Sequence, residues 1–250
     1  MLSERAVVEL HGWTIHDVSD SWARAVPAWC DFVRGGHDFH RDLLHGPALL
    51  DACGDVRGHR ALDLGCGEGW CSRELAARGA LVTGIDVCEE MIEAARSHPR
   101  QAHEPVEYLV MDAAEVSHRS WPAPLDLVTA CMALHTMPEP VPALRAAREV
   151  LAPGGRIVCS IPHPMTHMVD DYFRSGAFRV RWDVPRAGGS WETVRWSRTL
   201  SEYTAMFRAA GFVIHELLEP CSSGAEIAEH PTLRDTDRRP RHLVLVAVPA

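Results

Sequence analysis

The sequence lacks several features that would point to other classes of protein. Its eight cysteines include no CxxC pair, and its 250 residues contain no apolar run long enough to cross a bilayer. Because zinc ribbons and redox centres use paired cysteines, we expect buried free thiols in a reducing cytoplasm. The N-terminal residues carry charges where a secretory signal needs an apolar core, which also favours a cytoplasmic protein.

Positive charge is scarce as well. The 25 Lys and Arg residues are outnumbered by 34 Asp and Glu residues, for a formal net charge of −9. The short basic stretch 234–241 is interrupted by Asp235 and Asp237. Since nucleic-acid binding needs a basic patch, we expect no nucleic-acid or membrane partner and a small molecule as substrate.

The segment ALDLGCGEG (61–69) joins an apolar strand to a glycine-rich turn. Glycines at 65, 67 and 69 allow a sharp turn and bring backbone amides close to a ligand, although such clusters also end strands in ordinary turns. The dinucleotide fingerprint GxGxxG needs a small residue at position 70, where this chain has Trp70. The spacing therefore argues against NAD.

Further apolar segments follow, each with a polar carboxyl end. LVTGIDV (81–87) contains Asp86, at about the 20-residue separation that places a carboxylate against ribose hydroxyls. VEYLVMDA (106–113) leads into Asp112, and DLVTACMALHTM (126–137) leads into a loop. Because parallel strands end at one edge of a sheet, these segments predict a nucleotide-like ligand there.

The segments DLGCGEG, GIDVCEEM, MDA, DLVTACMALH and LAPGGRIVCS, between residues 55 and 163, together resemble the class I S-adenosylmethionine-dependent methyltransferases. The resemblance implies S-adenosyl-L-methionine as cofactor and S-adenosyl-L-homocysteine as product. It also implies an α/β, Rossmann-like fold with a seven-stranded, mostly parallel sheet. The strand order would be 3-2-1-4-5-7-6 with a reversed C-terminal hairpin, and helices would cover both faces.

The resemblance also assigns roles to individual residues. Asp63 occupies the first acidic position, Asp86 would bind the ribose, and Val87 with Met91 would flank the adenine. Position 88 departs from the family, which commonly has Ser there, because this chain has Cys88. The implied cofactor-binding residues are Asp63, Gly65, Cys66, Gly67, Asp86, Val87, Met91, Asp112, Ala113, Cys131 and Met132, with Arg41 as a contact from the N-terminal region.

We expect one methyltransferase domain over residues 1–250. Its parts are an N-terminal helical cap (1–55), a cofactor-binding core (56–163), a lid insertion after the fifth strand (164–197), and a C-terminal helix with two strands (198–250). The cap contains aromatic residues at helical spacing, which predicts two helices that either close over the cofactor or buttress the sheet. A capping box at 199–202 predicts a helix over 201–210.

The insertion 164–197 shows no regular strand or helix pattern and is rich in aromatic residues, as substrate lids are. Its aromatic side chains would either line the substrate pocket or pack the insertion onto the sheet. The candidate substrate-binding residues are Tyr172, Phe173, Trp182, Trp191 and Trp196.

Methyl transfer from a sulfonium is an in-line displacement, and a protonated acceptor needs a base. His135 and His163 follow strands at the ligand-binding edge, and His167 could reach the acceptor from the lid; these three are the candidate catalytic residues. Pro164 disfavours a helix that would place His163 and His167 on one face, so we expect no metal.

The tail with HPM (163–165), WSRTLSEY (196–203) and ELLEP (216–220) also resembles the ubiquinone and menaquinone biosynthesis methyltransferases, with Ser197 where that group has a His. We therefore expect methyl transfer to an oxygen or nitrogen of a small, natural-product-like molecule. C-methylation, a non-methylating use of the cofactor, and a non-catalytic cofactor-binding module are alternatives. A homodimer is also left open.

Overall fold

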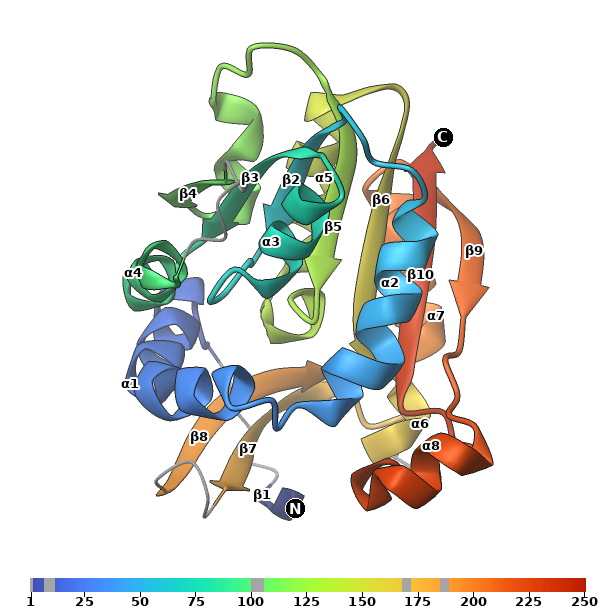
Figure 1. The fold of residues 1–250 in the computed structure, drawn as a ribbon. Helices are drawn as coiled ribbons and strands as arrows, with labels where there is room; N and C mark the ends of the chain where they lie inside the picture. Colours follow the sequence, from blue (N-terminus) through green and yellow to red (C-terminus); the bar gives the residue numbers. More distant parts are fainter. Residues whose placement is uncertain (1, 7–11, 100–105, 168–171, 185–188) are drawn as a thin grey trace.

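The computed structural model describes residues 2–6, 12–99, 106–167, 172–184 and 189–250. Seven strands form the main sheet in the order β4-β3-β2-β5-β6-β10-β9, which confirms the predicted 3-2-1-4-5-7-6 order (Figure 1). The first five run parallel, and β10 is antiparallel to β6 and β9. The strands are β2 (Arg60–Leu64), β3 (Leu81–Asp86), β4 (Val106–Val110), β5 (Leu125–Cys131), β6 (Leu151–Pro162), β9 (Phe212–Leu218) and β10 (His242–Pro249).

Helices connect the strands, as expected for a parallel sheet. The longer ones are α1 (Ile15–Arg34), α2 (Gly46–Cys53), α3 (Trp70–Ala77), α4 (Glu89–Ser97), α5 (Pro140–Val150) and α7 (Leu200–Ala209). The short ones are the π-helix η1 (Arg41–His45), the 3-10 helices η2 (Ala113–His118), η3 (Leu134–Thr136) and η5 (Pro231–Leu233), and α6 (Pro164–His167) and α8 (Gly224–Glu229). The predicted capping box opens α7, with Thr199 and Glu202 bonding reciprocally.

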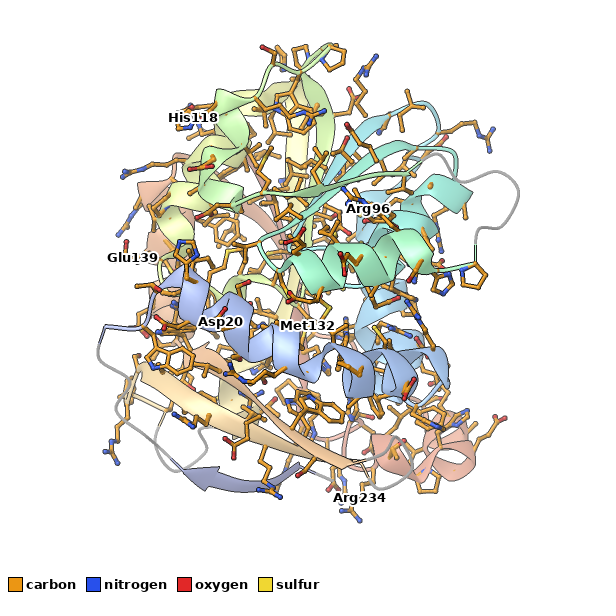
Figure 2. All side chains as sticks on the ribbon, turned by 90° about the vertical axis from the view of Figure 1, so that its left-hand side faces the viewer. Asp20, Arg96, His118, Met132, Glu139 and Arg234 are labelled. Atoms are coloured by element: carbon orange, nitrogen blue, oxygen red, sulfur yellow. The ribbon has the colours of Figure 1, made fainter. Side chains whose placement is uncertain are left out.

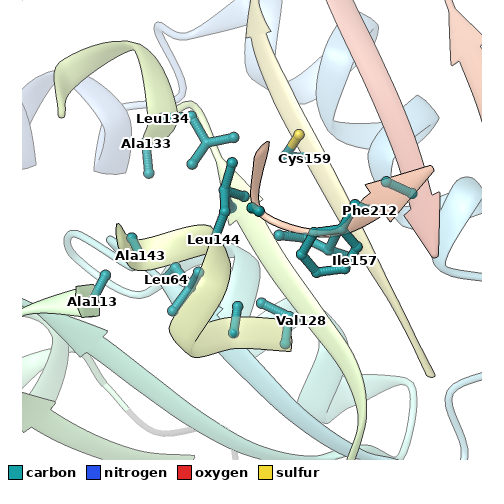
Figure 3. Packing of buried hydrophobic residues seen from close by; sticks show 14 of the residues in the cluster. Leu64, Ala113, Val128, Ala133, Leu134, Ala143, Leu144, Ile157, Cys159 and Phe212 are labelled. Carbon is teal, nitrogen blue, oxygen red and sulfur yellow. The ribbon is translucent and has the colours of Figure 1, made fainter. Parts of the chain in front are cut away.

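The two faces of the sheet are buried against different helices. Leu64 and Val128 point to the face covered by α5, where Leu144 is fully buried among them (Figure 3). Ala61 is three residues from Leu64 and Leu127 is one residue from Val128, so both point to the opposite face, where they pack against α2 and α3. Because both faces are covered, a ligand must bind at the strand ends, and in open α/β sheets it binds at the carboxyl ends.

The prediction that residues 164–197 contain neither strand nor helix is wrong. β7 (Gly176–Val184) and β8 (Gly189–Ser197) form an antiparallel hairpin, and β1 (Leu2–Ala6) adds to β7 as a third strand. Before the hairpin, the one-turn helix α6 starts at Pro164, a position where proline's fixed φ fits a first helical turn. In Figure 1 the hairpin lies beyond the carboxyl ends of the parallel strands.

The N-terminal region contains the two expected helices. Thr14 caps α1 in a capping box with Asp17, and α1 packs along β8. Trp29 of α1 contacts Trp182 of β7 edge-to-face, with ring centroids 6.0 Å apart. Helix α1 therefore lies between the hairpin and the sheet edge. No helix in the described part of the chain is both long and apolar enough to cross a membrane.

Candidate active site

A cavity of about 1400 Å³ opens at the carboxyl edge of the main sheet. Its walls come from the glycine turn after β2, the ends of β3 and β5, helix α1 and the β7–β8 hairpin. Met132, which follows β5 directly, lies between the sheet and the hairpin near the centre of Figure 2. The cavity therefore extends from the glycine turn to the insertion.

The glycine turn is shaped for close approach of a ligand. Gly65 and Gly67 have φ of 61° and 55°, in the left-handed region that favours glycine. A Cβ on Gly65 would come within 2.7 Å of the Ala133 Cβ, whereas one on Gly67 would meet nothing within 4 Å. Gly67 thus leaves its backbone open to the cavity. Between them, burial raises the pKa of the Cys66 thiol, which keeps that side chain neutral.

Asp86 ties this turn to the end of β3. Its Oδ2 accepts a hydrogen bond from the Gly67 amide and its Oδ1 accepts one from the Cys88 amide, both at 2.9 Å. Burial raises the pKa of Asp86, and the two amides oppose that shift by stabilising the carboxylate. The carboxylate lines the cavity with lone pairs left for hydroxyl donors. The site fits the ribose of an adenosyl group at this position.

The wall beyond Asp86 contains the residues predicted to contact the adenine. Val87, Met91, Asp112 and Ala113 all line the cavity. Asp112 Oδ1 accepts a hydrogen bond of 2.9 Å from the backbone amide of residue 114, which caps η2 and orients the carboxylate. This arrangement brings side chains from the ends of β3 and β4 and from helix α4 into one wall.

Cys131, Met132 and Arg41 also line the cavity. Met132 has a φ of 53°, held by its amide donating to the Ser160 carbonyl at 3.0 Å. The Arg41 guanidinium lies 5.0 Å from the Trp70 ring centroid and pairs with Asp42 at 2.8 Å. The π-helix thereby supplies a cation close to the glycine turn.

Asp63 is the one predicted cofactor residue outside the cavity wall. It is fully buried, and its carboxylate accepts hydrogen bonds from Ser72 of α3 at 2.7 Å and Thr129 of β5 at 2.9 Å. Burial raises its pKa to about 7. Asp63 therefore acts on the glycine turn through its neighbours, by fixing α3 to the sheet.

The three candidate histidines have different environments. His135, in η3, lines the cavity, is buried, and has an Nδ1 without a hydrogen-bond partner. His163 does not line this cavity: its Nε2 bonds to Glu219 at 3.0 Å and its Nδ1 accepts from the Met165 amide at 3.1 Å. With both ring nitrogens occupied, His163 fits a structural role better than the predicted catalytic one. The side chain of His167 is outside the described residues.

Of the five predicted substrate-binding aromatics, only Trp182 lines the cavity. Trp191 stacks behind it, with ring centroids 6.1 Å apart and an interplanar angle of 8°. The Tyr172 hydroxyl accepts a hydrogen bond from the first amide of α7, and Trp196 lies beside Arg198. Phe173 is 89% exposed. The strand pairing accounts for Trp196, which lies on the face of the hairpin opposite to Trp182 and Trp191, whereas Tyr172 and Phe173 precede the hairpin.

Sequence reasoning missed several residues of the cavity wall. These are His45 of the π-helix, Thr193 and Arg195 of β8, and His242 of β10. The alternation of Trp191, Thr193 and Arg195 is a strand signal that could have identified the β8 residues. The histidines follow no local pattern.

Two further expectations concern cysteines and metals. All eight cysteines are free thiols, but Cys221 is exposed and Cys131 is only partly buried, so the expectation of buried thiols is wrong for these two. In the described ranges, no cluster of three or more His, Cys, Asp or Glu side chains is arranged to hold a metal ion.

Comparison with known proteins shows a similarity to methyltransferases. A family model described as a methyltransferase domain matches residues 62–159. A ubiquinone biosynthesis O-methyltransferase of Aeromonas salmonicida is 38% identical over 112 residues, which are 45% of this chain and 47% of that protein. This chain therefore spans about half the length of the curated relatives it matches.

Solved structures extend the similarity over most of the chain. An S-adenosylmethionine-dependent methyltransferase from Mesorhizobium loti is 27% identical with a TM-score of 0.64, covering 80% of this chain and 95% of that one. The DhpI–SAH complex is 21% identical with a TM-score of 0.62, covering 94% of this chain and 98% of that one, a likeness of fold. The domain match over residues 62–159 and the M. loti structure together show that the chain has the class I S-adenosylmethionine-dependent methyltransferase fold and is distantly homologous to the ubiquinone biosynthesis O-methyltransferases.

Proposed function

We propose that the protein transfers the methyl group of S-adenosylmethionine to an oxygen or nitrogen of a small, partly aromatic molecule. The observation that carries this proposal is the continuity of one cavity from Gly67 and Asp86 to His135 and Trp182. Its two ends differ in chemistry. Carboxylates and open backbone suit an adenosyl group, and an aromatic wall beside a histidine suits an acceptor.

The bound cofactor supplies a methyl group on a positively charged sulfur. Residues of the chain must hold the cofactor and position the acceptor. Asp86 and the Gly67 backbone would hold the adenosyl end, and Trp182 would hold the acceptor body against the hairpin. Positioning of this kind supplies much of the rate of a displacement reaction, because the reacting atoms need a separation of about 3 Å in line.

His135 would accept the proton of a hydroxyl or ammonium acceptor. Burial lowers its pKa well below the ordinary range, and the positive charges of Arg195 and Arg198 lower it further. The imidazole is therefore neutral near pH 7, the form that accepts a proton, while burial and the two arginines make it a weaker base than a free imidazole. An acceptor that is already deprotonated would not need this base.

Calorimetric titration with S-adenosylmethionine and S-adenosylhomocysteine tests the cofactor half of the proposal. Asp86→Asn keeps the size of the side chain but removes its charge, so we expect cofactor affinity to fall at least about tenfold, the loss typical of one hydrogen bond to a charged group. Asp51→Asn, at an exposed position on α2, is the matched control and should bind like the wild type. Folded wild-type protein that binds neither ligand would refute the proposal.

The acceptor half needs a chemical readout. Protein saturated with cofactor is incubated with pools of phenols, amines and aromatic acids, and products are sought by mass as the acceptor plus one methyl group. Fragmentation then assigns the methyl to oxygen, nitrogen or carbon. A product methylated at carbon would contradict the proposed acceptor atom while keeping the cofactor assignment.

A further inference from the structure

Cys71 and Cys131 are two thiols at the cofactor end of the main cavity. Cys71 lies in the first turn of α3, Cys131 is the last residue of β5, and both line the cavity. The alternation of β5 places Cys131 on the same face as Thr129, which is the face that α3 covers. Thr129 Oγ1 accepts a hydrogen bond of 3.8 Å from the Cys71 sulfur. The two cysteines therefore meet over the end of β5.

The two thiols differ in their surroundings. Ser160 Oγ lies 3.7 Å from the Cys131 sulfur and 3.4 Å from His45 Nδ1. With a proton on Nδ1, the imidazole donates to the hydroxyl, which donates to the sulfur, so a chain of hydrogen bonds reaches Cys131. A hydrogen bond from Cys71 lowers the pKa of Cys131 well below its ordinary value, and His45 and Ser160 lower it further.

The same contact has the opposite effect on the partner thiol. The hydrogen bond with Cys131 raises the pKa of Cys71 well above its ordinary value, and burial raises it further. Cys131 is thus the thiolate of the pair, and Cys71 is a neutral thiol that donates to it. Because the thiolate is the form of cysteine that attacks oxidants, Cys131 is the nucleophile and Cys71 lies in place to react second.

A third cysteine shows what an unreactive thiol looks like here. Cys53, the last residue of α2, belongs to the same buried cluster as Cys71. It is fully buried, it does not line the cavity, and burial raises the pKa of its thiol to about 12. A thiol that stays protonated and closed off from the cavity reacts slowly with oxidants. Access and ionisation therefore distinguish Cys71 and Cys131 from this neighbour.

We propose that Cys71 and Cys131 form a reversible disulfide that turns off cofactor binding when a peroxide enters the cavity. The Cys131 thiolate attacks one peroxide oxygen, the O–O bond breaks, and the other oxygen leaves as water, which gives a sulfenic acid. The Cys71 sulfur then attacks the Cys131 sulfur, the S–O bond breaks, and a second water leaves with the Cys71 proton. Two thiols lose two electrons in total, and one peroxide is reduced to two waters.

The disulfide would affect the cofactor site because both cysteines adjoin it. Cys71 follows the glycine turn, which ends at Gly69, and Cys131 precedes Met132, which lines the cavity. A bond between the sulfurs draws the start of α3 towards the end of β5 and so displaces the turn that Gly67 leaves open. This consequence rests on the proposed function, whereas the formation of the disulfide does not.

Mild oxidation of the full chain tests the inference. Reduced protein without ligand is treated with hydrogen peroxide, its remaining thiols are alkylated, and it is digested without reductant. We expect two fewer alkylated thiols than in untreated protein, and one cross-linked peptide that joins Cys71 to Cys131. Calorimetry on a portion kept free of the alkylating agent should show an affinity for S-adenosylhomocysteine at least about tenfold below that of reduced protein. Dithiothreitol should restore it by thiol–disulfide exchange.

Three variants locate the effect. Cys71→Ala removes the second thiol, so peroxide should leave Cys131 as a sulfenic acid that dimedone traps, without a cross-link. Cys53→Ala removes the neighbouring buried thiol and is the matched control, which should form the wild-type cross-link. Cys221→Ser removes the exposed cysteine and should do the same, as expected for a bond within one molecule. Each variant is compared with its own reduced form, so a change in basal affinity does not enter the comparison.

The outcomes separate the disulfide from the proposed function. The inference is overturned if peroxide-treated wild type contains no link between Cys71 and Cys131, if Cys53 forms the link instead, or if the linked protein binds S-adenosylhomocysteine as well as the reduced protein does. Failure of reduced wild type to bind S-adenosylhomocysteine would instead overturn the proposed function, and with it the control of cofactor binding. The peptide map would then still decide whether the disulfide forms.

Discussion

His135 shows how much a single residue depends on its surroundings. Its ring is buried in η3, beneath β8, where Arg195 and Arg198 both place positive charge. Burial and these charges disfavour the imidazolium, so the pKa falls well below the ordinary 6.5. His163, one of the other candidates, is instead bound to Glu219 and to a backbone amide. The two histidines are alike in sequence context and differ in what they can do.

Replacement of His135 by Gln should lower kcat by about 100-fold or more for an acceptor that must lose a proton, the usual contribution of a general base. Because the His135 pKa is low, the wild-type rate should stay flat as pH falls to about 6.5 and decrease only below it. His163→Gln is the control and should affect stability more than kcat. Equal losses of kcat in the two variants would argue against His135 as the base.

At the scale of elements, sequence patterns predict the parallel strands but not the β7–β8 hairpin. Each core strand combines an apolar run with a turn residue at its end. The order of the strands in the sheet is implied by the family resemblance and not by these local signals. Residues 176–197 do alternate, since Phe178, Val180 and Trp182 share one face, but aromatic residues on both faces make this strand pattern hard to recognise. The third strand of that sheet comes from residues 2–6, and no local signal links two segments so far apart.

Trp182 of the hairpin, which lines the cavity, and Phe173, an exposed residue before it, predict opposite results on substitution. Trp182→Ala should raise the KM for the acceptor about tenfold or more, since it removes an aromatic contact and its buried area. Phe173→Ala should change KM by less than about twofold, as expected for an exposed side chain. Neither should alter the affinity for S-adenosylmethionine. Steady-state kinetics on both variants checks this, and a large effect at Phe173 would restore its predicted role.

At the scale of the whole molecule, Asp63 links the stability of the fold to the cofactor site. The carboxyl lies under α3, bonded to Ser72 and Thr129, and has no access to solvent. Its identity as the first acidic residue was readable from the sequence, but its partners were not, because Thr129 is 66 residues away on another strand. The role of Asp63 therefore lies in its contacts, which join strands β2 and β5 to helix α3.

The raised pKa of Asp63 predicts a pH dependence of global stability. Its folded-state pKa of about 7 exceeds its ordinary 3.8, so between these values the folded protein holds a proton that the unfolded chain releases. The contribution of Asp63 to the free energy of unfolding should therefore fall as pH rises from about 4 to about 7 and stay constant above. At 1.36 kcal/mol per pKa unit, the whole fall is at most about 4 kcal/mol.

Denaturant unfolding of wild type and Asp63→Asn at pH 5 and pH 8 measures this effect, because the asparagine cannot titrate. We expect the wild type to lose stability relative to the variant on going to pH 8. Ser72→Ala removes a donor that favours the charged carboxylate, so it should raise the pKa of Asp63 and extend the decline to higher pH. A stability difference between wild type and Asp63→Asn that is the same at both pH values would mean that Asp63 is ionised throughout, held by Ser72 and Thr129 strongly enough to overcome its burial.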